Sequence, residues 1–212
     1  MEILLNNEVN LKGTVVSGIE YSHEIYSEKF NKFVLRVPRL SENYDEVIIT
    51  ASERITEGLN IKEGNEIKIE GQFRSYNNYT ETGSRLVLTV FAKNIEFCDD
   101  INDDPNAIYL NGFICKEPVY RTTPFGREIC DVLIAVNRQY GKSDYIPCIT
   151  WGRNAKFTGN LEVGTNIKIW GRIQSRNYRK KVSEDEFVEK TAYEVSVTKM
   201  EIVQKEEEMY TV

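Results

Sequence analysis

Apolar and polar residues alternate in five segments of each half of the chain. The clearest case is the segment 130–137, where Cys130, Val132, Ile134 and Val136 share one parity. A period of two residues is typical of a strand that buries one of its faces. The pattern therefore predicts ten strands, at 9–17, 30–37, 46–51, 66–76 and 85–97, and again at 107–115, 130–137, 145–151, 166–178 and 192–203.

The second half of the chain repeats the first at a spacing of 99 to 105 residues. Leu-Lys-Gly at 11–13 returns as Leu-Asn-Gly at 110–112, and the segment 64–71 returns at 164–171. A repeat of this length is a whole domain rather than a unit of a solenoid. We expect a first domain at 1–98, an acidic linker at 99–105, a second domain at 106–203 and an acidic C-terminal end at 204–212.

Each half has room for a short helix after its third predicted strand. In the second half this segment is 152–162, and the Thr-Pro-Phe-Gly sequence at 123–126 is typical of a turn. Five strands with a helix after the third is the plan of the OB-fold, a small Greek-key barrel. The predicted fold class is all-β, with two tandem OB-folds.

The charge is distributed unevenly. The formal net charge of −6 argues against a simple basic nucleic-acid binder, but residues 1–105 carry −8 and residues 106–212 carry +2. Without the last nine residues the second domain carries +4. This asymmetry suggests that the two domains have different roles.

Several other classes are disfavoured. No segment approaches the roughly 20 apolar residues of a membrane span, and the first eight residues lack the features of a signal peptide. The four cysteines form no C-x-x-C pair, so we expect small buried side chains in a reducing cytosol rather than metal ligands. The single histidine, His23, is expected in a solvated loop, and no nucleophile or phosphate-loop motif is present. We therefore expect no enzyme, metal or cofactor.

The outward face of the second domain interleaves rings with cations. In the fourth strand, Ile167, Ile169 and Ile173 should point inward, which leaves the other parity to Lys168, Trp170, Arg172, Gln174, Arg176 and Tyr178. Single-stranded nucleic acid needs this combination, because unpaired bases stack on aromatic rings and phosphates require cations. Packing within the barrel is the alternative for the two tryptophans, and a solvated basic loop is the alternative around Arg176 and Tyr178.

The segments 120–138, 144–152 and 171–178 resemble three strand motifs of the bacterial single-stranded DNA-binding protein family, in register over about 100 residues. The first domain resembles this family mainly through the second. The resemblance implies base stacking on Tyr140, Tyr145, Trp151 and Tyr178 and tilts the choice of ligand from RNA to DNA. The corresponding positions of the first domain fall near Leu40, Tyr44 or Asp45, Ala51 and Asn78, so we expect one competent barrel and one degenerate barrel.

The candidate residues form three groups. The stacking candidates are Tyr140, Tyr145, Trp151, Tyr178 and Trp170. The candidates for phosphate contacts are Arg121, Arg138, Lys142, Arg153, Arg172, Arg176 and Arg179. The auxiliary candidates in the first domain are Tyr44, Tyr76, Arg39 and Arg74.

We predict sequence-independent binding of single-stranded DNA, protecting it in replication, repair, recombination or the processing of plasmid or phage DNA. The location would be cytoplasmic and nucleoid-associated, with no membrane partner. The alternative is an assembly or adaptor protein of a replication or primosome complex, whose first domain binds protein, with the first strand at 8–16 as one candidate edge. Because the family commonly places four barrels around one strand, two barrels suggest a homodimer, with a monomer as the alternative. The family's acidic Pro-Phe tip is missing at 205–212, so recruitment of replication or repair proteins through it is not carried over.

Overall fold

The computed structural model describes residues 5–39, 41–80, 83–181 and 187–203 of the chain. The first half forms one barrel with a single short helix, α1 (Glu53–Thr56), in the position that the sequence predicts. Its strands are β1 (Asn7–Val15), β2 (Glu20–Ile25), β3 (Glu28–Pro38), β4 (Tyr44–Ser52), β5 (Glu66–Thr80) and β6 (Gly83–Phe97). The expected C-terminal end at 204–212 lies outside the described residues.

The second half repeats this order. Its helix α2 (Arg153–Thr158) follows the third long strand, and a 3-10 turn, η1 (Gln139–Gly141), precedes that strand. Its strands are β7 (Asn106–Ile114), β8 (Val119–Thr122), β9 (Glu128–Asn137), β10 (Ser143–Trp151), β11 (Asn166–Lys181) and β12 (Phe187–Ile202). The prediction of tandem OB-folds is confirmed.

Each barrel also has a strand that the sequence pattern does not predict. The strands β2 and β8 pair with β3 and β9 as the first arms of hairpins. Almost all of their residues are exposed, so neither shows the alternation that marks a strand with a buried face. The prediction that His23 lies in a loop is wrong, because it lies in β2, where its ring stacks on Phe30 at 4.9 Å.

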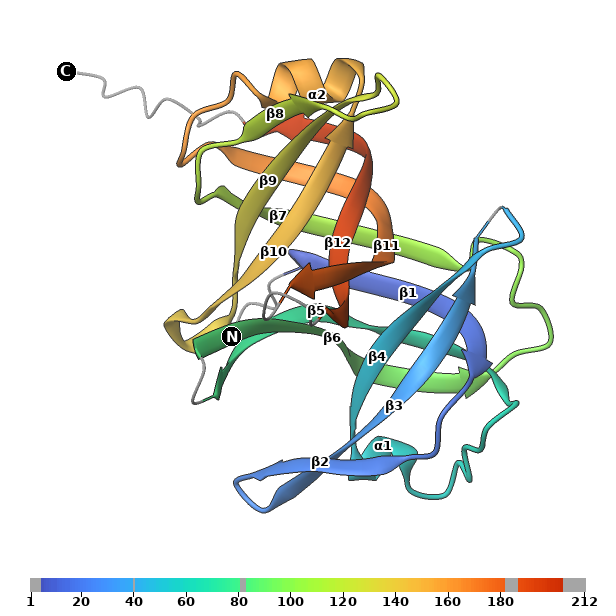
Figure 1. Cartoon of the computed structure of the whole chain (residues 1–212). Helices are drawn as coiled ribbons and strands as arrows, with labels where there is room; N and C mark the ends of the chain where they lie inside the picture. The colour runs from blue at the N-terminus through green and yellow to red at the C-terminus, as the bar shows by residue number, and fades with distance from the viewer. Residues whose placement is uncertain (1–4, 40, 81–82, 182–186, 204–212) are drawn as a thin grey trace.

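The two barrels share one hydrogen-bonded sheet. Strand β1 pairs antiparallel with β5 on one side and with β7 of the other barrel on the other, from Asn7 opposite Leu110 to Leu11 opposite Asn106. Figure 1 shows β1 and β7 side by side between the barrels. The hypothesis that the first strand is a free edge for a partner is therefore wrong, since both of its edges are already paired within the chain.

The interior of each barrel is filled by side chains of alternate parity. Leu11, Phe33 and Phe73 are fully buried in the first barrel, and Leu110 and Ile134 in the second. The isoleucines predicted to face inward from the fourth strand, Ile167, Ile169 and Ile173, are all buried. Apolar burial of this extent is the main favourable contribution to folding.

The glycines of the repeated motifs mark close approaches between strands. A register shift in each long hairpin occurs between Glu70 and Gly71 and between Trp170 and Gly171. A Cβ atom on Gly71 would overlap the carbonyl oxygen of Phe91, and one on Gly171 would overlap that of Ser196. The two bulges bend the hairpins so that each barrel can close, and only glycine fits there.

No helix within the described ranges is long and apolar enough to cross a membrane. All four cysteines are free, with Cys130 and Cys148 buried. In the part of the chain that the structure describes, no three His, Cys, Asp or Glu residues gather where they could hold a metal ion.

Candidate nucleic-acid interface

Strand β10 presents aromatic rings on the outer face of the second barrel. Tyr145 is 46% exposed and Trp151 is 36% exposed, while Ile149 between them is buried. The indole Nε1 of Trp151 donates a hydrogen bond to the hydroxyl of Ser196 on the adjacent strand β12, at 3.1 Å. This bond fixes one edge of the ring on the sheet and leaves part of its surface open to a ligand.

Tyr140 lies in the turn between β9 and β10. Its side chain is 86% exposed, and its backbone has a φ of 63°, in the left-handed region that non-glycine residues rarely adopt. The N–H of Arg138 donates to the carbonyl of Lys142 at 2.7 Å and closes this turn. A tyrosine held in a costly conformation at the surface is a recognised feature of ligand sites.

Trp170 has a different environment. Its ring packs against Tyr109 with a centroid distance of 5.2 Å, and the Lys199 ammonium lies 4.5 Å from its centroid. The structure therefore favours a packing role for Trp170. The backbone of Tyr178 pairs with Lys190 in the β11–β12 hairpin, but the side chains of Tyr178 and Arg179 lie outside the described residues.

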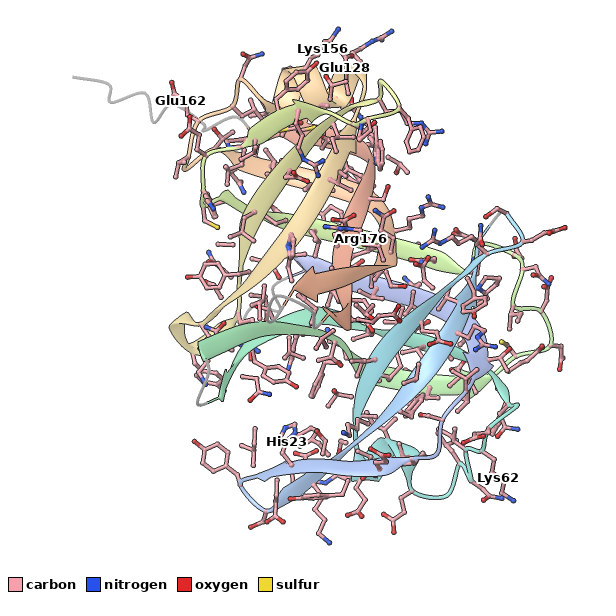
Figure 2. The ribbon with its side chains drawn as sticks, viewed as in Figure 1. His23, Lys62, Glu128, Lys156, Glu162 and Arg176 are labelled. Atoms are coloured by element: carbon pink, nitrogen blue, oxygen red, sulfur yellow. The ribbon has the colours of Figure 1, made fainter. Side chains whose placement is uncertain are left out.

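Several of the predicted phosphate contacts are paired with carboxylates of the barrel. Arg121 donates two hydrogen bonds to Asp131, at 2.6 and 3.2 Å, and these raise the pKa of the guanidinium. Arg176, which Figure 2 labels on β11 at the middle of the molecule, lies 4.0 Å from Glu194. The Arg121–Asp131 pair is exposed, and exposed ion pairs contribute little to stability, so Arg121 can exchange its carboxylate partner for a phosphate. Glu194 is mostly buried, but Arg176 itself is exposed to solvent.

The other cations of this group differ in their surroundings. Lys142 and Arg153 are exposed, and neither has an ion pair within the described ranges. Arg172 is half-buried and lines a small cavity beside Pro105 and Asn106. Arg138 is held between the barrels, where its Nε lies 3.3 Å from a carboxylate oxygen of Asp144.

The first barrel lacks rings at the equivalent positions of β4. The ladders match Tyr145 opposite Ala135 with Glu46 opposite Arg36, and Trp151 opposite Ile129 with Ser52 opposite Phe30. Glu46 forms a 2.7 Å ion pair with Arg36. A stacking position of the second barrel is thus occupied by a salt bridge in the first.

Of the expected positions in the first barrel, Asn78 is the equivalent of Tyr178, whereas Leu40, Asp45 and Ala51 each lie one residue before the true equivalent. Asp45 and Ala51, taken as equivalents of the stacking residues, are both fully buried. A one-residue shift along a strand moves a side chain to the opposite face, which explains the difference. The N–H of Arg39 donates to the carbonyl of Asn43 as that of Arg138 does to Lys142, which places Ser41, rather than Leu40, at the position of Tyr140. Leu40 itself lies outside the described residues.

The auxiliary candidates of the first barrel divide into two pairs. Tyr44 and Tyr76 are about half exposed, and the Arg36 guanidinium lies 4.2 Å from the centroid of the Tyr44 ring. Arg39 donates two hydrogen bonds to Asp45 and a third, of 3.0 Å, to the carbonyl of Ser175 in the second barrel. Arg74 lines a cavity between the barrels. These two arginines therefore lie at the seam, which we define as the junction made by β1 and β7 and by the hairpin residues that cross it.

The seam has reciprocal contacts. Asp144 accepts a 2.7 Å hydrogen bond from the backbone N–H of Ser75, and Asp45 accepts one of 2.6 Å from that of Ser175. Asp144 follows Asp45 by 99 residues, and Ser175 follows Ser75 by 100. The two barrels are therefore related as the halves of a two-fold dimer would be. The sequence did not reveal these residues as contacts, although their repeated positions were a usable signal.

The chain is therefore a tandem OB-fold protein, with two barrels joined through one ladder and with exposed rings and cations on the outer face of the second barrel. The comparisons with known proteins agree. Residues 105–203 match the model of the Single-strand binding protein family. The second barrel is thus similar to this family over its whole length.

Individual relatives give the same picture. Single-stranded DNA-binding protein A of Bacillus subtilis (strain 168) is 34% identical over 90 residues, which are 39% of this chain and 52% of that protein. Single-stranded DNA-binding protein 1 of Staphylococcus aureus (strain COL) is 36% identical over 39% of this chain and 54% of that protein. The chain thus spans about half the length of these curated relatives.

The wild-type single-stranded DNA binding protein from Thermus aquaticus superposes over 94% of each chain with a TM-score of 0.70 and 18% identity. The agreement over both barrels establishes the tandem fold.

Proposed function

We propose that the second barrel binds single-stranded DNA without sequence preference and without a catalytic step. The observation that carries this proposal is the pair of exposed rings on β10, Tyr145 and Trp151, in a domain that matches the family. Bases stack on such rings with about 1–3 kcal/mol each, whatever their sequence, because every base has a flat face. Tyr140 and Tyr178 belong to the same proposed set.

Phosphate contacts would complete the site. Lys142 and Arg153 can bind a phosphate directly, whereas Arg121 and Arg176 would first release their carboxylate partners. Arg172 and Arg179 belong to the same proposed set, and Tyr44 and Tyr76 would add weaker contacts on the first barrel. A duplex should bind more weakly, because its bases are paired and stacked on one another and offer no open face to the rings.

In the cell, this activity would protect single-stranded DNA in replication, repair, recombination or the processing of plasmid or phage DNA. We expect a nucleoid-associated protein that forms a homodimer, so that four barrels surround one strand. The adaptor alternative is not favoured, because the family match supports single-stranded DNA binding and because the one candidate edge named for it pairs with β7. Contacts with replication or repair proteins remain part of the proposal.

The test is a fluorescence titration with an unstructured oligothymidine at two salt concentrations. The wild-type emission should be quenched on binding, and the Trp170→Phe variant, in which only Trp151 reports, should be quenched to a similar fraction. The Trp151→Phe variant should lose most of the signal. Equal affinity for duplex and single strand would contradict the proposal.

A further inference from the structure

A cavity of about 340 Å³ lies at the seam, and both barrels contribute to its wall. Its cations are Arg74 and Lys93 from the first barrel and Arg138 and Lys142 from the second. The rest of the lining is amide side chains and Tyr140, and no carboxylate takes part. Although the first barrel is acidic, two of its cations therefore lie where it meets the η1 turn of the second barrel.

The positive charge in this cavity is under-compensated. Asp144 is the carboxylate nearest to the two guanidiniums, but one of its oxygens accepts the N–H of Ser75, and the other lies 3.3 Å from Arg138. The Nε atoms of Arg74 and Arg138 are buried and have no hydrogen-bond partner. Lys93 and Lys142 have no ion pair within the described ranges. An anion in the cavity would satisfy these groups.

The opposite side of the seam shows that three of these four cations are not needed to join the barrels, since only Arg138 has a cationic counterpart there, Arg39. The ladders place Gln174 at the position of Arg74 and Thr198 at that of Lys93. The turn residues Ser41 and Asn43 stand at the positions of Tyr140 and Lys142. That side makes the same aspartate–serine contact with no counterpart of Arg74, Lys93 or Lys142, so these three cations point to a ligand rather than to assembly.

Tyr140 connects the cavity to the stacking face. It lines the cavity, yet 86% of its side chain is exposed, so a base can stack on the ring while the adjacent phosphate enters among the cations. Lys93 is the bulged residue of β6, because Glu70 pairs with Asn94 and Gly71 pairs with Ala92. Its exposed side chain lines the cavity.

We propose that this seam cavity is a phosphate site built by both barrels, through which the bound single strand passes from the second barrel onto the first. The ligand chemistry is a phosphate ester, and its source is the backbone of the strand rather than a free phosphate compound. The proposal rests on the proposed function of the second barrel. It assigns the first barrel a direct contact with the strand in spite of its negative charge.

The test compares Arg74→Gln and Lys93→Thr, which import the residues of the opposite side, with Lys62→Thr as a control. Lys62 lies at the far end of the first barrel, as Figure 2 shows. Each variant is titrated with oligothymidines of about 8 nucleotides, which one barrel can hold, and about 30 nucleotides, which need both. At 0.1 M salt each lost phosphate contact should weaken binding of the long oligonucleotide about fivefold and lower the salt slope by about 0.7. The short oligonucleotide and the control should be unchanged.

The possible failures are distinguishable. If the wild-type chain binds neither oligonucleotide, the proposed function itself is wrong. If it binds both and neither variant weakens the long one, or if both lengths are weakened equally, the seam is not the crossing point and only this inference falls. A third measurement is the melting temperature in the presence of pyrophosphate. If pyrophosphate raises the melting temperature of the wild type but not of Lys93→Thr, and Lys93→Thr binds the long oligonucleotide as tightly as the wild type does, the cavity binds a free phosphate compound instead. Lys93 is exposed, so this variant should fold normally.

Discussion

The backbone N–H of Ser75 in the first barrel donates a 2.7 Å hydrogen bond to Asp144 in the second. The hydroxyl of Ser75 accepts a second bond of 2.7 Å from the N–H of Tyr145, so the same contact supports a proposed stacking residue. Asp144 is fully buried. The β5–β6 hairpin is therefore both a part of the first barrel and a support for the outer face of the second.

Removing this carboxylate should be costly. Asp144→Ala would leave the Ser75 N–H and the Arg138 guanidinium without their partner, and we expect a loss of about 3–5 kcal/mol in the free energy of unfolding. Asp131→Ala is the matched control, because its ion pair with Arg121 is exposed and should contribute at most about 1 kcal/mol. Urea denaturation measures both. Similar losses for the two variants would show that the buried contact at the seam contributes no more to stability than an exposed ion pair.

The stability of the protein should depend on pH through Asp144. Burial raises the pKa of this carboxyl above its ordinary value, although the Ser75 N–H, Arg138 and Arg74 favour the charged form. The folded state therefore holds this proton at a higher pH than the unfolded state does. Its contribution to stability is greatest below the unfolded pKa and declines as pH rises through the folded pKa.

The measurement is the difference in the free energy of unfolding between the wild type and Asp144→Asn, followed upward from about pH 4, near the unfolded pKa of Asp. This difference isolates Asp144 from carboxyls such as Glu128 and Glu201, whose pKa values are lowered by hydrogen bonds and whose contributions have the opposite sign. The wild type should lose stability relative to the variant as pH rises. A relative gain would mean that the ion pair with Arg138 outweighs burial.

The two tryptophans should differ in their importance for DNA binding. Trp151→Ala should weaken binding of oligothymidine by about 1–3 kcal/mol, the range for loss of a stacked base. Trp170→Phe keeps a ring against Tyr109 and Lys199 and should leave the affinity nearly unchanged. Isothermal titration calorimetry gives both values without relying on tryptophan emission. A larger loss for Trp170→Phe would reverse the assignment.

The bulge glycines should not tolerate a methyl group. Gly171→Ala would place a Cβ atom against the carbonyl of Ser196, and overpacking of this kind typically costs about 1–3 kcal/mol. Gly18→Ala is the control, because nothing lies within 4 Å of the added atom. Thermal melts of the two variants would separate strain at the bulge from a general effect of losing glycine.

Much of the fold could be predicted from local pattern, and the failures have a common cause. Strands with one buried face, such as β9 and β10, are predicted by apolar residues that recur at every second position. The strands β2 and β8 bury almost no side chains and have no such pattern. The stacking candidates Tyr145 and Trp151 were implied by the family resemblance, and both lie at positions of one parity and are exposed. Three of the four equivalents in the first barrel were misplaced by one residue, because no local pattern sets the register of a strand against its partner. The fourth, Asn78, does stand at the position of Tyr178.

The sequence by itself determined the number of barrels, their order and the parity of most strands, because a repeat and an alternating pattern are properties of neighbouring residues. Only the tertiary structure decided that β1 pairs with β7, that Asp45 and Asp144 each join one barrel to the other, and that Arg74 and Lys93 meet Arg138 and Lys142 in one cavity. These relations connect residues 45 to 130 positions apart, and their geometry depends on how two closed barrels dock. The charge of each domain, counted along the chain, does not contain that information, which is why an acidic barrel can still present cations at the seam.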